Sequence, residues 1–179
     1  MNLEIKSKFF PTTHTMTPEL DAVVKCFEEK VQEITSSDNL HLTSNQVLAI
    51  LQEPLERIGF KVEKGKCKGE RIELSLVTNG NGVKTFFVDA LSKDGKTIIE
   101  IESGRGVHGY QFLKDIFSAF ILPDVEYLVI AVLQEYKSRK SSSKRPATKD
   151  YDVACAYLDA LFSSPKFTPP LKGILIVGY

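Results

Sequence analysis

Three acidic residues, Asp89, Glu100 and Glu102, lie in two short segments that are otherwise strongly apolar. The segments 84–91 and 97–103 have the β-branched and aromatic content that is typical of β-strands. Acids on a strand often do no more than face solvent. The isoleucine, valine and phenylalanine around these three argue against a fully solvated strand. The acids are therefore candidates for chemistry.

The turn between the two segments predicts which of these acids share a face. Asp94-Gly95 is a strong signal for a two-residue hairpin turn, and such a turn places Asp89 directly opposite Glu100. Opposed side chains share one face with Cβ atoms roughly 5 Å apart, and Glu102, two residues on, points the same way. Like charges so placed repel, so we expect a divalent cation such as Mg²⁺ to neutralise them. Such a cation can activate water for phosphodiester hydrolysis.

The rest of the sequence predicts the elements that position these acids. An irregular arm over about residues 1–15 precedes a helix over 18–35, which Thr17-Pro18 starts. A second helix begins near Ser44, and Pro54 inside it is expected to kink or restart it. Further elements are expected as strands at 71–78, 126–133 and 173–177 and helices at 109–121 and 151–163.

This order, α-α-β-β-β-α-β-α-β, predicts an α/β protein with a mixed sheet flanked by helices. We expect a single domain over residues 1–179. Its parts are an N-terminal arm and helix at 1–43, a core at 44–133, a basic loop at 137–149, and a C-terminal helix and strand at 150–179.

The acidic hairpin resembles the PD-(D/E)xK restriction-endonuclease-like nucleases. The shared pattern is an Asp on one strand, a hairpin, a Glu-x-Glu on the next strand, and then a helix and a strand. Residues 97–132, TIIEIESGRGVHGYQFLKDIFSAFILPDVEYLVIAV, are most similar to the BamHI and BglII branch of type II restriction enzymes. In that branch Glu-x-Glu or Glu-x-Gln replaces Glu-x-Lys, and a Gly-rich corner leads into the helix. The resemblance covers the topology of about 44–133 and is specific in motif over 84–133, although Val88 replaces the family's frequent Pro.

The resemblance implies a Mg²⁺-dependent endonuclease, in which Mn²⁺ can substitute. Asp89, Glu100 and the backbone carbonyl of Ile101 would be metal ligands. Glu102 takes the position of the family's Lys, as water activator or second-metal ligand. Members often add an acid from the helix before the sheet. The candidates for an additional acid here are Glu53, Glu56 and Glu73.

Basic residues near the acids are candidates for contacts with DNA phosphates. Arg105 lies in the Gly-rich corner after the acidic strand and suits a phosphate, since Arg binds it bidentately. His108 in the same corner either contacts DNA or caps the helix. The loop 137–149 has no acid and is either a flexible solvated loop or a DNA contact. Its candidate residues are Lys137, Arg139, Lys140, Lys144 and Arg145.

Composition excludes several other classes. The 179 residues include 23 Lys+Arg and 23 Asp+Glu, so the formal net charge is zero, which argues against a general polyanion binder. Three isolated cysteines form no C-x-x-C pair, which argues against a zinc site and favours a reducing cytoplasm. We expect no signal peptide and no membrane span. No Walker loop or nucleophile elbow occurs, and His14 and His41 are assigned no role.

The predicted function is that of an endonuclease acting on double-stranded DNA, most concretely a cytoplasmic type II restriction enzyme that forms a homodimer. The helices at 18–35 and 109–121 are apolar enough to be core or to form the dimer interface, and the sequence leaves both open. Two alternatives remain. One is a non-catalytic DNA- or protein-binding relative, and the other is a repair or phage nuclease of the same fold.

Overall fold

The fold is described by a computed structural model, in which residues 4–35, 42–65, 67, 69–78, 80, 82–104, 107, 109–136 and 147–179 are described. The strands are β1 (Lys6–Phe10), β2 (Lys61–Val62), β3 (Ile72–Val77), β4 (Val83–Val88), β5 (Ala90–Leu91), β6 (Thr97–Glu102), β7 (Tyr127–Val132) and β8 (Gly173–Gly178). The helices are α1 (Pro18–Glu29), α2 (Val31–Ile34), α3 (Ser44–Arg57), α4 (Gln111–Ile121) and α5 (Asp150–Phe162). The predicted α/β class is confirmed.

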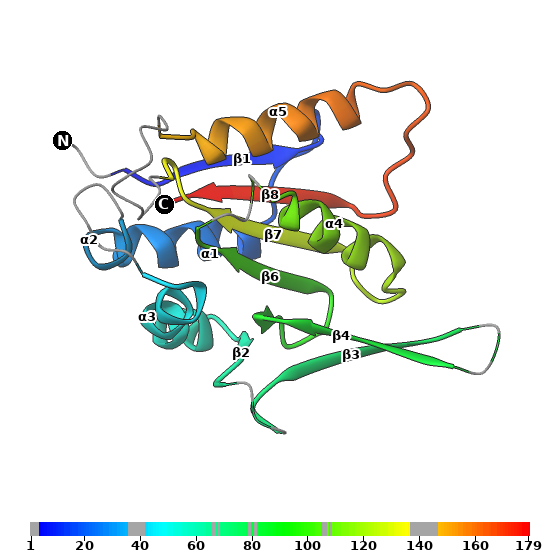
Figure 1. Cartoon of the computed structure of the whole chain (residues 1–179), viewed down its shortest axis with the longest axis horizontal. Helices are drawn as coiled ribbons and strands as arrows, with labels where there is room; N and C mark the ends of the chain where they lie inside the picture. The colour runs from blue at the N-terminus through cyan, green and yellow to red at the C-terminus, as the bar shows by residue number, and fades with distance from the viewer. Residues whose placement is uncertain are drawn as a thin grey trace.

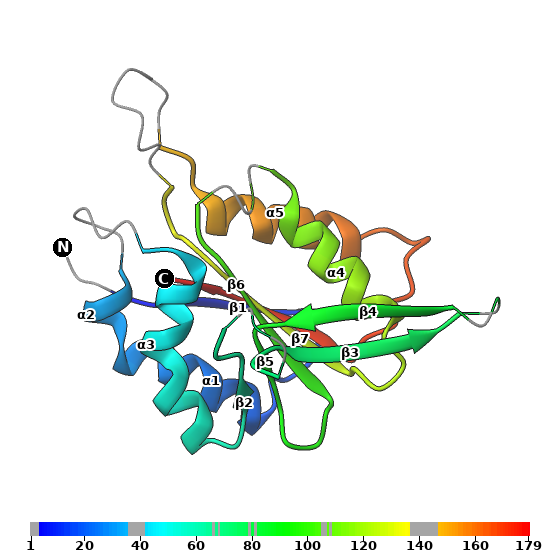
Figure 2. The same cartoon turned by 60° about the horizontal axis from the view of Figure 1, so that its bottom comes forward.

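A six-stranded mixed sheet with the order β1-β8-β7-β6-β5-β2 forms the centre of the fold. β6, β7 and β8 are parallel, whereas β1, β5 and β2 run antiparallel to their neighbours. The parallel strands are joined through α4 and α5, as crossover connections require. Both helices cover one face of the sheet, and α1, α2 and α3 cover the other (Figures 1 and 2).

Each face of the sheet has its own hydrophobic core. On β6, Ile99 and Ile101 belong to the core that includes α1 and α3, whereas Ile98 belongs to the core beneath α4 and α5. Successive side chains of a strand point to opposite faces. Glu100 and Glu102 therefore lie on the face that α4 and α5 cover.

The predicted single strand over 84–91 is wrong, because the chain changes sheets at Asp89. Before it, β4 pairs only with β3 in a separate two-stranded ribbon, which projects from the body of the molecule (Figures 1 and 2). After it, β5 pairs with β6. Asp89 itself bonds to the main sheet: its carbonyl oxygen accepts from the Glu63 N–H, with an N···O distance of 2.8 Å.

The predicted irregular N-terminal arm is also wrong, since it contains β1, which pairs antiparallel with β8 along five residues. Phe10 is buried, and the ammonium group of Lys8 lies 2.7 Å from a carboxylate oxygen of Asp159 on α5. Lysines are common on edge strands, where they discourage pairing with other chains. They also lower the apolar content of the segment, which hides it from a search for hydrophobic alternation.

The helix boundaries follow the capping signals better than the hydrophobic pattern. Thr17 caps α1 as expected, but the predicted helix over 18–35 is interrupted at Lys30, after which α2 begins. α3 runs through Pro54 without a break, so the helix does not restart there. Pro54 lies in the last turn of α3, which ends at Arg57.

Two further expectations concern residues outside these elements. Cys26, Cys67 and Cys155 are free thiols, in agreement with their isolation in the sequence. Among the helices in the described part of the chain, none is long and apolar enough to cross a membrane.

Candidate active site

The hairpin between β5 and β6 has the predicted register with a different turn. Ala90 pairs with Ile99, which is the register that the sequence predicts, and the charge of Asp89 raises the pKa of Glu100, so these two acids are neighbours. The connection is a four-residue loop and not a two-residue turn, because the Ser92 N–H donates to the Thr97 carbonyl at 2.9 Å. A symmetric extension of the loop by one residue on each side leaves the register unchanged.

Asp89 is fixed by the strand beside it. Its Oδ2 accepts a hydrogen bond from the backbone N–H of Ile101 at 2.7 Å. Burial raises the pKa of Asp89 to about 6, while the Ile101 hydrogen bond acts against that shift and the charges of Glu63 and Asp115 add to it. Burial disfavours the charged form of a carboxyl group, and nearby negative charges do the same.

Glu63 is an acid of this site that the sequence did not reveal. Val62 of β2 pairs with Ala90 of β5, so Glu63 occupies the rung opposite Asp89. Glu63, Asp89 and Glu100 therefore form a row across three neighbouring chain segments on one face of the sheet. β2 has only two residues, which is too short to show a hydrophobic period. No sequence signal could have found Glu63.

Glu100 lies in the middle of the acids. Burial raises its pKa well above the ordinary value, and the charges of Asp89, Asp115 and Glu102 raise it further. The site thus holds a carboxyl group that is protonated more readily than a solvated one. A positive charge placed beside it would reverse this shift.

A second pair of acids, Glu102 and Asp115, lies next to this row. Burial, then the charge of Asp115 and a hydrogen bond to its side chain, raise the pKa of Glu102 to about 7. Burial likewise raises the pKa of Asp115 to about 6, opposed by its hydrogen bond with Glu102 and the charge of Lys114. Asp115 Oδ2 is buried without a hydrogen-bond partner among the described residues.

Asp115 was also absent from the predicted site, although the sequence contains a signal for it. Phe112 and Ala119 are buried on α4, and Asp115 stands three residues after the first and four before the second. Residues at these spacings share one face of a helix. A charged residue on the buried face of an apolar helix is therefore the feature that could have pointed to Asp115.

The additional acids proposed from the resemblance do not join the cluster. Glu53 and Glu56 form exposed ion pairs on α3, with Arg57 and Lys64 respectively. Glu73 is exposed on β3. It pairs with Phe87, on the ribbon face opposite to that of buried Ile72.

The predicted DNA contacts lie outside the described residues. These are Arg105, His108, Lys137, Arg139, Lys140, Lys144 and Arg145. Lys114 of α4 is a described basic residue near the acids, and its charge lowers the pKa of both Glu102 and Asp115.

The residue types of the cluster fit a hard divalent cation. All candidate ligands are oxygen atoms, which Mg²⁺ prefers, and the unpartnered Oδ2 of Asp115 lacks the donor or cation that a buried carboxylate needs. In the described part of the chain, no three His, Cys, Asp or Glu side chains already form a group that could hold a metal ion. Coordination by several of these acids would therefore require their side chains to rotate.

In comparisons with known proteins, no protein-family model and no curated protein matches the chain.

Proposed function

We propose that the chain is a Mg²⁺-dependent endonuclease that hydrolyses phosphodiester bonds of double-stranded DNA, most concretely a type II restriction enzyme. The observation that carries this proposal is the row of Glu63, Asp89 and Glu100, with Glu102 and Asp115 beside it. Burying several acids together is costly unless a positive charge accompanies them. A metal site gives such a cluster a physical reason.

In this proposal each residue has a distinct part. Asp89 and Glu100 would hold the metal with the carbonyl of Ile101, and Asp89 keeps its orientation through the Ile101 N–H. When bound, Mg²⁺ polarises a phosphoryl oxygen and lowers the pKa of water. Glu102 positions or deprotonates the attacking water. Asp115, through its hydrogen bond with Glu102, is a positioning residue.

The order of elements after the acids supports the same reading. β6 is followed by α4 and then by the parallel strand β7, the succession that the resemblance implies. This succession aligns Asp115 of α4 with the acids of β6.

A homodimer belongs to the same proposal, because cutting both strands of a palindrome needs two sites. α4 exposes Tyr110, Leu113 and Phe117, and α5 exposes Val153 and Tyr157. Tyr110 and Tyr157 touch edge to face, with ring centroids 6.1 Å apart, so the two helices present one apolar surface. Aromatic surfaces of this kind are typical of protein interfaces. Sedimentation of the protein, and of Phe117→Lys as the disrupting variant, tests this part.

The competing function is a DNA- or protein-binding relative that does not cleave. The retained cluster speaks against it, because a binding module has no need of five neighbouring acids.

Incubation of the purified protein with mixed-sequence plasmid and phage DNA tests these functions. Discrete fragments that require Mg²⁺ or Mn²⁺ support a restriction enzyme, and a smear supports a non-specific nuclease in a repair or phage role. Intact DNA that is nevertheless bound in a gel-shift assay supports the binding relative. EDTA is the control for the metal.

Two variants link the activity to the site. We expect Asp89→Ala and Glu100→Ala to lose cleavage and to keep DNA binding. Glu53→Ala is the matched control, since it removes an acid that lies on the exposed surface of α3. Full activity of Asp89→Ala or Glu100→Ala would remove that residue from the proposed site.

A further inference from the structure

A pocket of about 250 Å³ lies at the opposite end of the sheet from the acids and is lined by Phe9, His14, Thr15, Tyr127 and Lys172. Tyr127 pairs with Thr97 at the first residue of β6, and Glu102 is the last residue of the same strand. Five residues of strand separate them, which corresponds to about 16 Å. The pocket is therefore distinct from the candidate active site.

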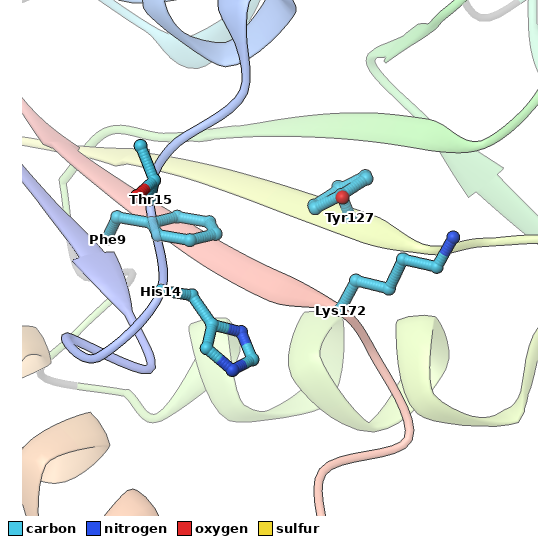
Figure 3. Close-up of a pocket in the computed structure, with 5 residues that line it drawn as sticks. All are labelled: Phe9, His14, Thr15, Tyr127 and Lys172. Carbon is cyan, nitrogen blue, oxygen red and sulfur yellow. The ribbon is translucent and has the colours of Figure 1, made fainter.

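Figure 3 shows Phe9, His14 and Thr15 on one side of the pocket and Tyr127 and Lys172 on the other. The two aromatic rings are half buried and pack against the core beneath α1 and α3. Two aromatic walls suit a flat ring, which stacks on them at little cost in shape. His14, Thr15 and Tyr127 add an imidazole and two hydroxyl groups, which can donate or accept hydrogen bonds at the edge of such a ring.

The walls of this pocket are held in place. A Cβ atom added to Gly173 would lie 2.1 Å from Cζ of Phe9, so the Phe9 ring covers the glycine backbone closely and depends on the absence of a side chain there. The Tyr127 N–H donates to the Lys96 carbonyl at 3.0 Å, and the Lys172 N–H donates to the Glu126 carbonyl at 2.8 Å.

Lys172, the charged residue that lines the pocket, belongs to a group of ion pairs at its rim. The carboxylate of Glu126 forms ion pairs with two lysines. Its oxygens lie 3.0 Å from Nζ of Lys96 and 2.6 Å from Nζ of Lys172. The charge of Asp94 also raises the pKa of Lys96, so these two lysines and two acids balance. The group available to an anion is the Lys172 ammonium, which lines the pocket and has three N–H donors. The volume is below the roughly 300–1,000 Å³ of pockets that enclose drug-sized ligands, so a single ring fits inside and the rest of a ligand stays at the rim.

We propose that this pocket binds a pyrimidine nucleotide, with the base between Phe9 and Tyr127 and the phosphate at the Lys172 ammonium group. The nucleotide is either free or part of a single strand, because both present the same base and phosphate. The proposal is independent of the nuclease proposal, since the pocket shares no residue with the acid cluster.

Chemical-shift mapping of the full chain in EDTA tests the proposal without metal and without cleavage. We expect thymidine 5′-monophosphate, at micromolar to millimolar concentration, to shift the amides of Phe9, Phe10, residues 12–15, Tyr127 and Gly173. Deoxyribose 5-phosphate, which lacks the base, leaves these amides in place. Absence of shifts with the nucleotide, or equal shifts with the sugar phosphate, would overturn the proposal.

Variants of the lining residues make the test specific. Loss of one neutral hydrogen bond weakens binding about fivefold, which we expect for His14→Ala. Thr13→Ala, an exposed change in the same loop, is the matched control and binds like the unaltered protein. Tyr127→Leu removes a stacking surface and weakens binding at least about fivefold. Unchanged affinity in both His14→Ala and Tyr127→Leu would contradict the assignment.

Two further measurements separate the sources and test the fixed wall. A short oligothymidylate that shifts the same amides at lower concentration than the mononucleotide identifies a strand as the ligand, and the reverse order identifies a free nucleotide. Gly173→Ala displaces the Phe9 ring, so nucleotide shifts are lost although no lining residue is altered. If Gly173→Ala does not fold, His14→Ala decides the question.

Discussion

The two faces of β6 are built from alternate residues of one strand and differ completely in chemistry. Ile99 and Ile101 are fully enclosed by apolar side chains in the core beneath α1 and α3. Glu100 and Glu102 alternate with these isoleucines along β6 and lie on the other face, among acids whose pKa values burial raises. The isoleucine face stabilises the fold by burying apolar side chains. The acid face destabilises the fold, because it buries carboxyl groups, and it provides a site that favours a cation.

The sharpest way to test this contrast is to change one residue on each face with little change in shape. Glu100→Gln removes one negative charge from the acid cluster, and we expect cleavage to fall about 100-fold to 1,000-fold, as when a charge-stabilising group is lost elsewhere. Ile99→Val is the matched variant on the opposite face and keeps the cleavage rate. Rates measured on plasmid DNA with Mg²⁺ check both. An equal loss in the two variants would mean that the faces do not differ in function.

The opposite experiment measures stability. Ile99→Ala leaves a cavity in a fully buried position, and we expect the free energy of unfolding to fall by about 2–5 kcal/mol. Glu100→Gln, in contrast, replaces a buried acid by a neutral group and does not lower the stability of the metal-free protein. Urea denaturation in EDTA gives both values. Destabilisation of Glu100→Gln to the same degree would indicate that Glu100 has a structural partner.

The acid face also predicts how stability depends on pH without metal. The pKa of Glu102 is raised from 4.5 to about 7 in the folded protein, so the folded state binds more protons than the unfolded chain between these values. The free energy of unfolding therefore decreases as pH rises from about 4.5 to about 7. Urea denaturation at several pH values in EDTA measures the decrease. We expect a smaller decrease in Glu102→Gln, and an unaltered one would locate the titration elsewhere.

The smallest effect is expected for an acid outside the cluster. Glu73 is exposed on the ribbon, so Glu73→Gln leaves the cleavage rate, the melting temperature and the pH dependence unchanged. Exposed charges contribute little to stability because water screens them. Loss of cleavage in this variant would bring Glu73 back into the site and weaken the distinction between cluster and surface.

The part of the site that depends on local pairing could be predicted from the sequence. The hairpin signal at Asp94-Gly95 predicted the register of β5 and β6 correctly. The loop has one more residue on each side than a two-residue turn, so the pairing of the strands is the same. Glu63 and Asp115 depend on contacts between distant segments. A two-residue strand and one helix position gave too little local signal to place them.

The fold shows the same division. The parallel strands and their helices have strong hydrophobic patterns, and their positions were predicted within a few residues. β1 was missed because an edge strand does not need a continuous apolar pattern. The division of 84–91 into two strands was missed because apolar residues continue on both sides of Asp89, and only the partner strands change.

The projecting ribbon of β3 and β4 has a consequence for amide hydrogen exchange. Its rung nearest the body, Ile72 with Val88, is buried at 2% and 3% exposure, whereas Val77 and Val83 at the far end are 70% and 65% exposed. Backbone hydrogen bonds without buried side chains open at low cost in free energy, so exchange is fastest at the tip and slows toward the body. The slow rung adjoins Asp89. Opening of the ribbon tip therefore leaves the backbone beside the acid cluster undisturbed.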